Sequence, residues 1–208
     1  MNPVSLRNEL KLKRQGFRTV AGVDEVGIGP LAGPVVAACV VLNKKVGLLD
    51  DSKKLSAKQR NRLFSKIVSN AHVGIGIVDN SHIDAMNILR ASQKAMALAV
   101  NSLSVSPDAL LVDGIRTLPG VKVHQIAIKH GDAKSSSLAA ASIIAKVVRD
   151  ALMDDYDVLY PHYRFSEHKG YGTKLHMSML KKFGPSPIHR LSFEPVRASL
   201  KRKGLMFF

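Results

Sequence analysis

One run of the sequence, GPVVAACVVL from Gly33 to Leu42, is apolar at almost every position. A strand with one face in water alternates polar and apolar residues, whereas an unbroken run rich in β-branched residues is typical of a strand covered on both faces. The chain therefore needs a layered fold with this strand inside it. A second run, Thr19 to Val23, precedes it across a turn rich in Gly and Pro, which predicts two adjacent strands.

Helices and strands alternate after these two strands. Ser56 and Gln59 form a capping box that opens a helix ending near residue 70. The patterns predict strands over 72–78, 109–112 and 121–128, and helices over 80–103, 137–156 and 173–183. This order argues for one α/β domain over residues 1–208 with a mixed sheet, divided into a core of about 17–160 and a basic C-terminal part of about 161–208.

Membrane and cysteine chemistry are not indicated. The apolar runs are about ten residues or fewer, against the roughly 20 that a membrane span needs, and the N-terminus lacks the apolar stretch of a secretory signal. We therefore expect a cytoplasmic protein without a membrane partner. The single cysteine, Cys39, lies inside the apolar run, so we expect a buried, inert thiol.

The formal net charge of +15 requires a physical reason, because self-repulsion of this size destabilises a protein that has no anionic partner. The charge is concentrated at the two ends of the chain. Residues 161–208 hold ten Lys and Arg against two acids, and residues 1–18 hold five against one. Nucleic acid is the first candidate partner, and a basic surface that only keeps the protein soluble is the alternative.

The few acids stand at informative places. Asp24 and Glu25 end the first expected strand, Asp113 ends a later strand, and Asp132 follows another. Sites in open α/β sheets gather beyond strand ends, so these four carboxylates are candidates to converge. Such hard oxygen ligands suit Mg²⁺ or Mn²⁺. Adjacent residues in a regular strand face opposite sides, so Asp24 and Glu25 share one site only if the strand twists or stops there.

Each acid also has a purely structural explanation. Asp113 before a glycine suits a turn, and Asp132 suits a helix cap. Gly27 and Gly29 offer the strand break that a shared site needs. They lack the third glycine of a dinucleotide fingerprint and the Gly-Lys-Ser/Thr of a P-loop, so nucleotide binding of those kinds is not supported.

Zinc is not supported either, because the sequence has no Cys pair and no closely spaced His pair of the zinc-helix kind. Four of the eight histidines lie in the basic C-terminal part, where we expect phosphate contact or simple exposure. These four are His162, His168, His176 and His189.

A carboxylate-rich site for two metal ions about 3.5–4 Å apart, beside a basic surface, suits phosphodiester hydrolysis. The residues therefore point to a nuclease, and they do not distinguish RNA from DNA.

Several long segments carry a further signal. They are GVDEVGIGPLAGPVVAACVVL from Gly22, DSKKL from Asp51, IDAMNIL from Ile83, LLVDG to Gly114, GDAKSSSLAAASIIAKVVRD from Gly131, YPHYRFSEHKGYGT from Tyr160, and GPSPIHRLSF from Gly184. In this order they resemble the motifs of the bacterial ribonuclease HII family, over roughly residues 17–196. The resemblance implies a ribonuclease H-like fold, with a mixed five-stranded sheet flanked by helices and a helical C-terminal part that grips the duplex.

The resemblance also implies an activity. Such an enzyme cuts the RNA strand of RNA/DNA hybrids and incises DNA duplexes on the 5′ side of an embedded ribonucleotide, leaving a 3′-hydroxyl and a 5′-phosphate. It uses Mn²⁺ or Mg²⁺, with two ions when substrate is bound. We expect a monomer, and the sequence leaves open whether a replication-associated protein is a further partner.

Residue by residue, the family's metal-binding and catalytic acids match the four acids chosen above. A further acid near that site matches Asp150, for which an ion pair on a helix surface is an equal reading. The tyrosine that packs against sugar at the RNA-to-DNA junction matches Tyr171, where discrimination rests on the 2′-hydroxyl. Phosphate contacts are expected from residues in matching basic motifs, with ordinary solvated charges as the alternative: Lys53, Lys134, Lys169 and Arg190.

The sequence departs from the family at one position. Where the family has Gly-Arg-Gly against the ribonucleotide, this chain has Gly27-Ile28-Gly29. Ile keeps the backbone amides but loses a charged fork that holds phosphate.

Two rival assignments are kept beside ribonuclease HII. One is a ribonuclease HIII-like enzyme, which carries an extra N-terminal substrate-binding domain, although only about 20 residues precede the first strand here. The other is a nucleic-acid-binding protein whose activity Ile28 has weakened.

Overall fold

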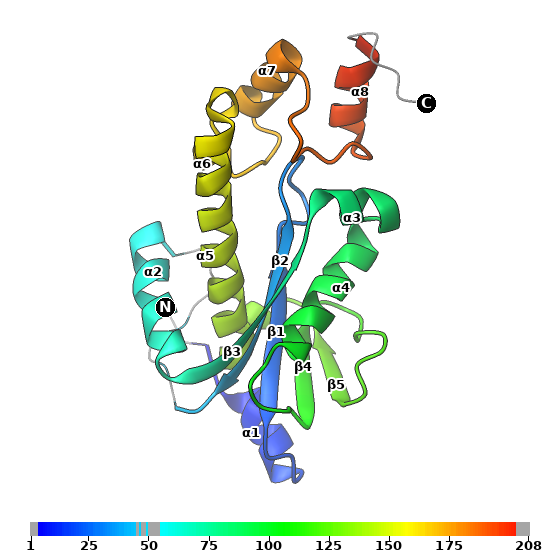
Figure 1. Cartoon of the computed structure of the whole chain (residues 1–208). Helices are drawn as coiled ribbons and strands as arrows, with labels where there is room; N and C mark the ends of the chain where they lie inside the picture. The colour runs from blue at the N-terminus through cyan, green and yellow to red at the C-terminus, as the bar shows by residue number, and fades with distance from the viewer. Residues whose placement is uncertain (1–3, 45, 47–48, 50–54, 203–208) are drawn as a thin grey trace.

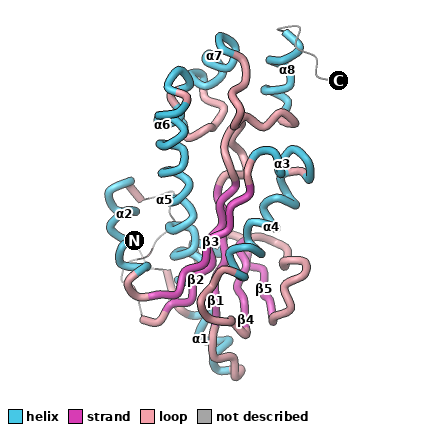
Figure 2. Tube along the Cα trace, in the orientation of Figure 1, coloured by secondary structure: helices cyan, strands magenta, loops and turns pink. Residues whose placement is uncertain are grey.

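The structure is a computed structural model that describes residues 4–44, 46, 49 and 55–202. Figure 2 shows how helices and strands are distributed over these ranges. None of the helices in them is long and apolar enough to cross a membrane.

Five strands form one mixed sheet, as predicted. Their order in the sheet is β3-β2-β1-β4-β5. The central strand, β1 (Val20–Val26), pairs antiparallel with β2 (Val35–Leu42), and β2 pairs antiparallel with β3 (Ala71–Val78). On the other side, β1 pairs in parallel with β4 (Ala109–Asp113), which pairs in parallel with β5 (His124–Ile128). The carboxyl ends of β1, β4 and β5 therefore point the same way.

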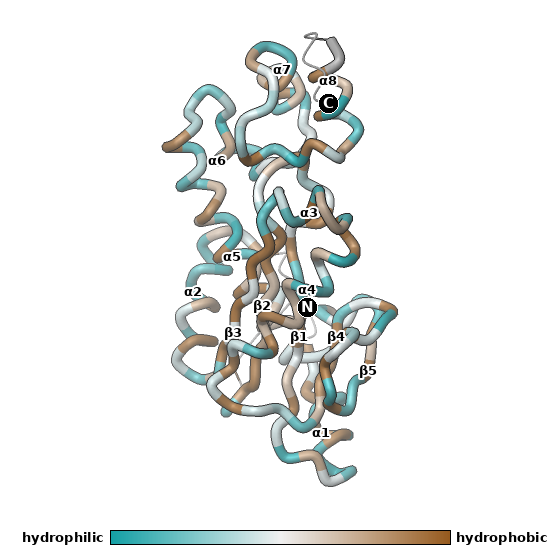
Figure 3. The backbone as a smooth tube through the Cα atoms, turned by 45° about the vertical axis from the view of Figure 1, so that its right-hand side comes forward, coloured by the Kyte–Doolittle hydropathy of each residue, from teal (hydrophilic) through white to brown (hydrophobic). Residues whose placement is uncertain are grey.

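Strand β2 is covered on both faces, which confirms the prediction from its apolar run. Alternate residues such as Val36 and Val40 pack against α2 (Ala57–Val68) and α5 (Ser136–Leu159). Val35, Ala37 and Cys39 pack on the opposite face against α4 (Ile88–Asn101). Figure 1 shows α2 and α5 on one side of the sheet and α4 on the other. Figure 3 shows that hydrophobic residues are concentrated in the strands.

The predicted helix over 80–103 is wrong in one respect, because it is two helices. Helix α3 (Asn80–Met86) ends where Asn87 takes a left-handed φ of 72°, and α4 (Ile88–Asn101) begins there. The Asn87 side chain accepts a hydrogen bond from the Arg90 backbone amide, so it caps α4. The capping box of Ser56 and Gln59, in contrast, is present as expected.

Both ends of the chain contain helices beyond those predicted. At the N-terminal end, α1 (Arg7–Arg14) packs near the first part of β1. The C-terminal part holds η2 (Pro161–Tyr163), α6 (Phe165–His168), α7 (Lys174–Phe183) and the unexpected α8 (Glu194–Arg202). Figure 1 shows this C-terminal part at the far end of α5, away from α1.

Candidate active site

Asp24 and Asp113 lie side by side on neighbouring parallel strands. The register pairs Val23 of β1 with Val112 of β4, so the next residue of each strand is an acid. Val23 and Val112 pack in the core on the α4 face, and side chains alternate along a strand, so both acids point to the α5 face. The Ser142 hydroxyl of α5 hydrogen-bonds to the Asp24 carboxylate there.

Asp132 is held near Asp113 by a hydrogen bond from its neighbour, Gly131. It lies in the short helix η1 (Gly131–Ala133) between β5 and α5, and it is buried. The Gly131 backbone amide donates to Asp113 Oδ1 at 2.6 Å, and the Ala133 amide donates to Asp132 Oδ1 at 3.0 Å. The loop that carries Asp132 is thereby tied to Asp113.

Helix α1 holds the segment that follows Asp132, a role that we did not predict. The buried Glu9 carboxylate accepts hydrogen bonds at 2.8 Å from both the backbone amide and the hydroxyl of Ser137. It also accepts one at 2.5 Å from the Ser135 hydroxyl. The first turn of α5 is therefore fixed by a carboxylate from the other end of the chain, which a charge count alone does not reveal.

The charge of Glu25 acts on Asp24, but the Glu25 side chain points to the other face of the sheet. The pairing of β1 with β2 stays regular through Glu25 and Val26, and the break comes only at Gly27, where φ is 98°. The strand break lies at Gly27, one of the two glycines that indicated it, and not at the acids themselves, so Glu25 leaves the strand on the side opposite Asp24. Within the described ranges, no three acidic, His or Cys side chains are gathered closely enough to hold a metal ion as they stand.

The electrostatics of Asp24 still indicate a cation site. Burial raises the pKa of the Asp24 carboxyl well above its ordinary value, and the nearby Glu25 and Asp113 carboxylates raise it further. Each cause makes the ionised form costly, and a bound cation would remove that cost. The donors are all hard oxygens, which fit a divalent ion such as Mg²⁺ or Mn²⁺.

The loop Gly27-Ile28-Gly29 follows β1 and is held from below by Arg190. The Arg190 guanidinium is fully buried and donates to Gly27 O at 2.6 Å, Ile28 O at 3.0 Å and Gly33 O at 2.9 and 3.0 Å. The expected phosphate contact from Arg190 does not fit this placement, because the guanidinium is buried and donates to backbone carbonyl oxygens. The side chain of Ile28, in contrast, is 43% exposed.

A second buried guanidinium, Arg149 of α5, joins this loop to the loop that carries Tyr171. It donates to Pro34 O at 3.0 Å, Ala32 O at 3.2 Å and Lys169 O at 3.0 Å. It also lies over the Tyr171 ring, 5.9 Å from its centroid. The side chain of Arg149 is fully buried, which is rare for an arginine.

Tyr171 is placed where a ligand can reach it. Its side chain is 40% exposed, and a Cβ added at Gly29 would lie 3.7 Å from the ring. Arg149 and Ser142 are seven positions apart on α5, which spans about 10 Å of helix. Helix α5 thus connects the acids, at Ser142, to the tyrosine, at Arg149.

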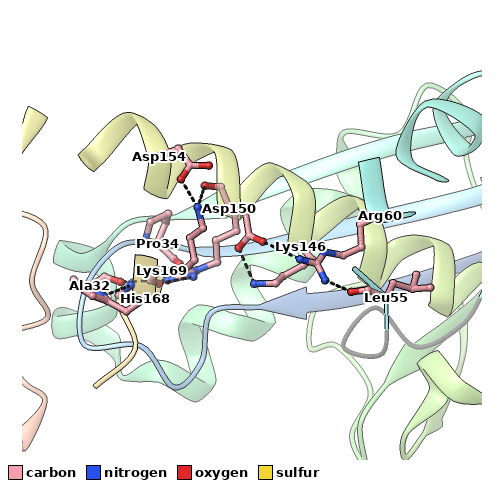
Figure 4. Close-up of polar contacts among 11 residues, drawn as sticks. Ala32, Pro34, Leu55, Arg60, Lys146, Asp150, Asp154, His168 and Lys169 are labelled. Atoms are coloured by element: carbon pink, nitrogen blue, oxygen red, sulfur yellow. Dashed lines mark hydrogen bonds and ion pairs between the residues drawn. The ribbon is translucent and has the colours of Figure 1, made fainter. Parts of the chain in front are cut away.

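Asp150 takes part in an ion-pair network, the alternative that the sequence left open. Its carboxylate accepts from Lys146 at 2.7 Å and lies 3.7 Å from Arg60 of α2. Lys169 pairs with Asp154 one turn further along α5. Figure 4 shows these contacts along one side of the helix. Lys169 is therefore already paired, and a phosphate would have to compete with Asp154 for it.

The remaining predicted basic contacts are Lys134 and Lys53. Lys134 is exposed and donates to the Lys129 carbonyl at 2.7 Å, next to the loop that carries Asp132. Lys53 lies outside the described residues.

Three of the four histidines of the C-terminal part do not follow the prediction of exposure or phosphate contact. His162 is exposed and stacks on Phe183, but His168, His176 and His189 are buried together. They contact one another and backbone groups, and no acid or cysteine joins them within the described ranges to form a metal site.

Comparison with known proteins identifies the family. The sequence profile of the family described as Ribonuclease HII matches residues 21–196, which is most of the chain. The chain belongs to the ribonuclease HII family. It is therefore an enzyme of the ribonuclease H class, an endonuclease acting on RNA/DNA hybrids. This family match favours ribonuclease HII over ribonuclease HIII, the rival assignment that the sequence left open.

Individual relatives agree. The ribonuclease HII of Geobacter sulfurreducens is 53% identical over 195 residues, covering 92% of this chain and 89% of that protein. The ribonuclease HII of Lactobacillus gasseri is 55% identical over 185 residues, covering 88% of this chain and 73% of that protein.

Solved structures show the same fold. The ribonuclease H2 of Pyrococcus horikoshii superposes with a TM-score of 0.73 at 30% identity, covering 89% of this chain and 98% of that one. The ribonuclease HII of Archaeoglobus fulgidus, solved as a complex with PCNA, gives 0.73 at 25% identity, covering 85% and 96%.

Proposed function

We infer that the chain incises a DNA-paired strand on the 5′ side of a ribonucleotide, leaving a 3′-hydroxyl and a 5′-phosphate. The observation that carries this proposal is the pairing of Asp24 with Asp113 on parallel strands, where burial and neighbouring carboxylates raise the pKa of Asp24. Such a site needs a cation, and the net charge of +15 suits an anionic polymer as substrate.

Asp24, Glu25, Asp113 and Asp132 would hold Mg²⁺ or Mn²⁺, two ions with substrate bound. When bound, the ions activate water and stabilise the leaving oxygen. The chain's own residues do the positioning. Ser142 orients the Asp24 carboxylate, and the Gly131 amide orients that of Asp113.

The substrate's sugar would be bound about two helical turns further along α5 than the acids. The exposed Tyr171 ring packs against the sugar, and the loop Gly27-Ile28-Gly29 contacts the ribonucleotide through its backbone, whose shape Arg190 sets. The 2′-hydroxyl is the group that distinguishes RNA from DNA at such a position. Lys134 lies beside the loop that carries Asp132, and Lys169 lies two residues before Tyr171. Both are proposed to contact phosphate, Lys169 after release from Asp154.

A DNA duplex that contains one ribonucleotide tests the proposal. With Mg²⁺ or Mn²⁺, we expect a single cut on the 5′ side, whose 3′-hydroxyl product a polymerase can extend. Asp113→Asn should abolish the cut and still bind the duplex, since the basic surface is unchanged. Cutting on the 3′ side, or near-normal turnover by Asp113→Asn, would contradict the proposal, and tight binding without any cut would favour the binding-protein alternative.

The PCNA complex of the Archaeoglobus fulgidus relative suggests a sliding-clamp partner for this chain also. Size-exclusion chromatography of the protein alone and with a bacterial sliding clamp tests this, together with the expected monomeric state. Co-elution at micromolar concentration would support the clamp, and independent elution would oppose it.

A further inference from the structure

Three buried histidines lie behind the loop that carries Tyr171. His168, His176 and His189 are exposed by only 6%, 0% and 1%. The rings of His168 and His176 stack with centroids 4.3 Å apart. Buried polar groups are kept only where their hydrogen bonds are satisfied, so the partners of these rings reveal what they hold in place.

The hydrogen bonds of two of these rings run in one direction. The Ser186 backbone amide donates to His189 Nδ1 at 2.8 Å, so the ring hydrogen of neutral His189 lies on Nε2. That Nε2 is 3.0 Å from His176 Nε2, which must accept. The ring hydrogen of His176 is then on Nδ1, which donates to the Tyr171 carbonyl at 2.9 Å. The chain of bonds ends on the backbone of Tyr171.

This direction requires both rings to be neutral, and their surroundings keep them so. Burial, then the neighbouring His168, lowers the pKa of His176 to about 4. Burial, then His176, lowers the pKa of His189 to about 3. The charged side chains near the group, Glu167, Asp157 and Arg164, act on His168.

The backbone around Tyr171 is fixed on every side while its ring stays open. The Tyr171 amide donates to the His168 carbonyl at 2.9 Å, and the Gly170 amide donates to His168 Nδ1 at 3.2 Å. The Tyr171 carbonyl accepts from the Thr173 amide at 2.8 Å as well as from His176. Only the 40% exposed ring is left to meet a ligand.

The geometry points to His176, with His189 behind it, as a positioning residue that sets the Tyr171 backbone and thereby the selection of ribonucleotide junctions. This inference rests on the proposed role of Tyr171. His176 touches neither substrate nor the acids, so it acts through the direction of the tyrosine ring. Losing the hydrogen bond to the Tyr171 carbonyl should lower the selectivity a few-fold without removing activity.

Two substitutions at one position separate the hydrogen bond from the packing. His176→Asn places an amide NH₂ near the position of Nδ1 and keeps the donor, whereas His176→Phe keeps the ring and loses the donor. The readout is the ratio of kcat/KM on a duplex with one ribonucleotide to kcat/KM on a continuous RNA/DNA hybrid. We expect His176→Phe to lower this ratio about fivefold and His176→Asn to keep it within about twofold of the parent. Thermal unfolding of each preparation shows whether the variant is folded.

The Tyr171→Ala background distinguishes the two hypotheses. If Tyr171→Ala leaves the ratio unchanged, the proposed role of Tyr171 is wrong and the inference falls with it. If Tyr171→Ala lowers the ratio but His176→Phe does not, the inference alone is overturned. A fivefold effect of His176→Phe that persists in the Tyr171→Ala background also overturns it, because the two residues would then act independently. Should His176→Phe fail to fold, His189→Leu removes the preceding bond, and an unchanged ratio there would be equally decisive against it.

Discussion

Replacing Arg190 by Met should destabilise the protein strongly, although Arg190 forms no ion pair within the described residues. The substitution removes four hydrogen bonds to three backbone carbonyl oxygens. It also relieves the burial of a charge whose pKa is lowered, by burial and by the nearby Arg149, to about 9. Each carbonyl oxygen left without a donor in a buried setting costs about 1–3 kcal/mol. We expect the lower end of this range for the three oxygens, about 3 kcal/mol in all, which for a chain of this size lowers Tm by about 6–12 °C.

Differential scanning fluorimetry of three variants checks this estimate. Arg190→Lys keeps the charge but offers one compact donor in place of a planar fork, so it should lose nearly as much as Arg190→Met. Arg197→Met removes an exposed arginine that pairs with Glu194 at the surface, and it should shift the free energy of unfolding by less than about 0.5 kcal/mol.

The activity of Arg190→Met, measured well below its Tm, should show a raised KM for the single-ribonucleotide duplex, since the loop Gly27-Ile28-Gly29 loses its support. A Tm within 2 °C of the parent for either Arg190 variant would refute the reasoning. It would mean that the carbonyls find other donors and that the guanidinium does not hold the loop.

Three further outcomes are expected. Asp24→Asn should raise the Tm of the metal-free protein, because it removes a buried charge beside Glu25 and Asp113. The same variant should lower the rate of incision by more than about a hundredfold. A lower Tm would contradict the repulsion among these carboxylates. Ile28→Arg should raise kcat/KM on the single-ribonucleotide duplex, with a gain that shrinks in added salt, because the exposed side chain at this position can present a guanidinium to phosphate, and an equal or lower constant refutes it. Stability should fall as pH drops from 6.5 toward 4, because the neutral His176 and His189 take up protons more readily once unfolded; Tm measured from pH 7.5 to 5 should therefore fall less steeply in His176→Asn than in the parent, and equal slopes would oppose the assignment.

The sheet could be predicted because its signals are local. The run from Gly33 to Leu42 specifies a doubly covered strand by itself, and strand ends followed by acids mark the edge where a site forms. The break at Asn87 and the start of α8 at Glu194 were missed. Each nevertheless has a local signal, an Asn cap in the first and a proline in the first turn of the second.

The buried charges could not be predicted in the same way. Arg and His are usually at the surface, and the groups that satisfy Arg190 lie about 160 positions away in the sequence. Its burial depends on two loops meeting with several carbonyls turned inward, which becomes visible only when the chain is folded. The same holds for Glu9, whose serine partners lie 126 and 128 positions away.

The strand order has a consequence for how the enzyme loses activity. Strand β4 is buried and belongs to the same core as α4 and β1, whereas β5 is an edge strand whose residues are exposed or half-buried. Regions of a protein can open separately when few contacts hold them. An excursion that releases β5 and η1 would carry Asp132 away from Asp24 and Asp113 while the rest of the sheet remained folded. Inactivation on heating would then precede the main unfolding transition, and substrate analogues that bridge the two parts would delay it.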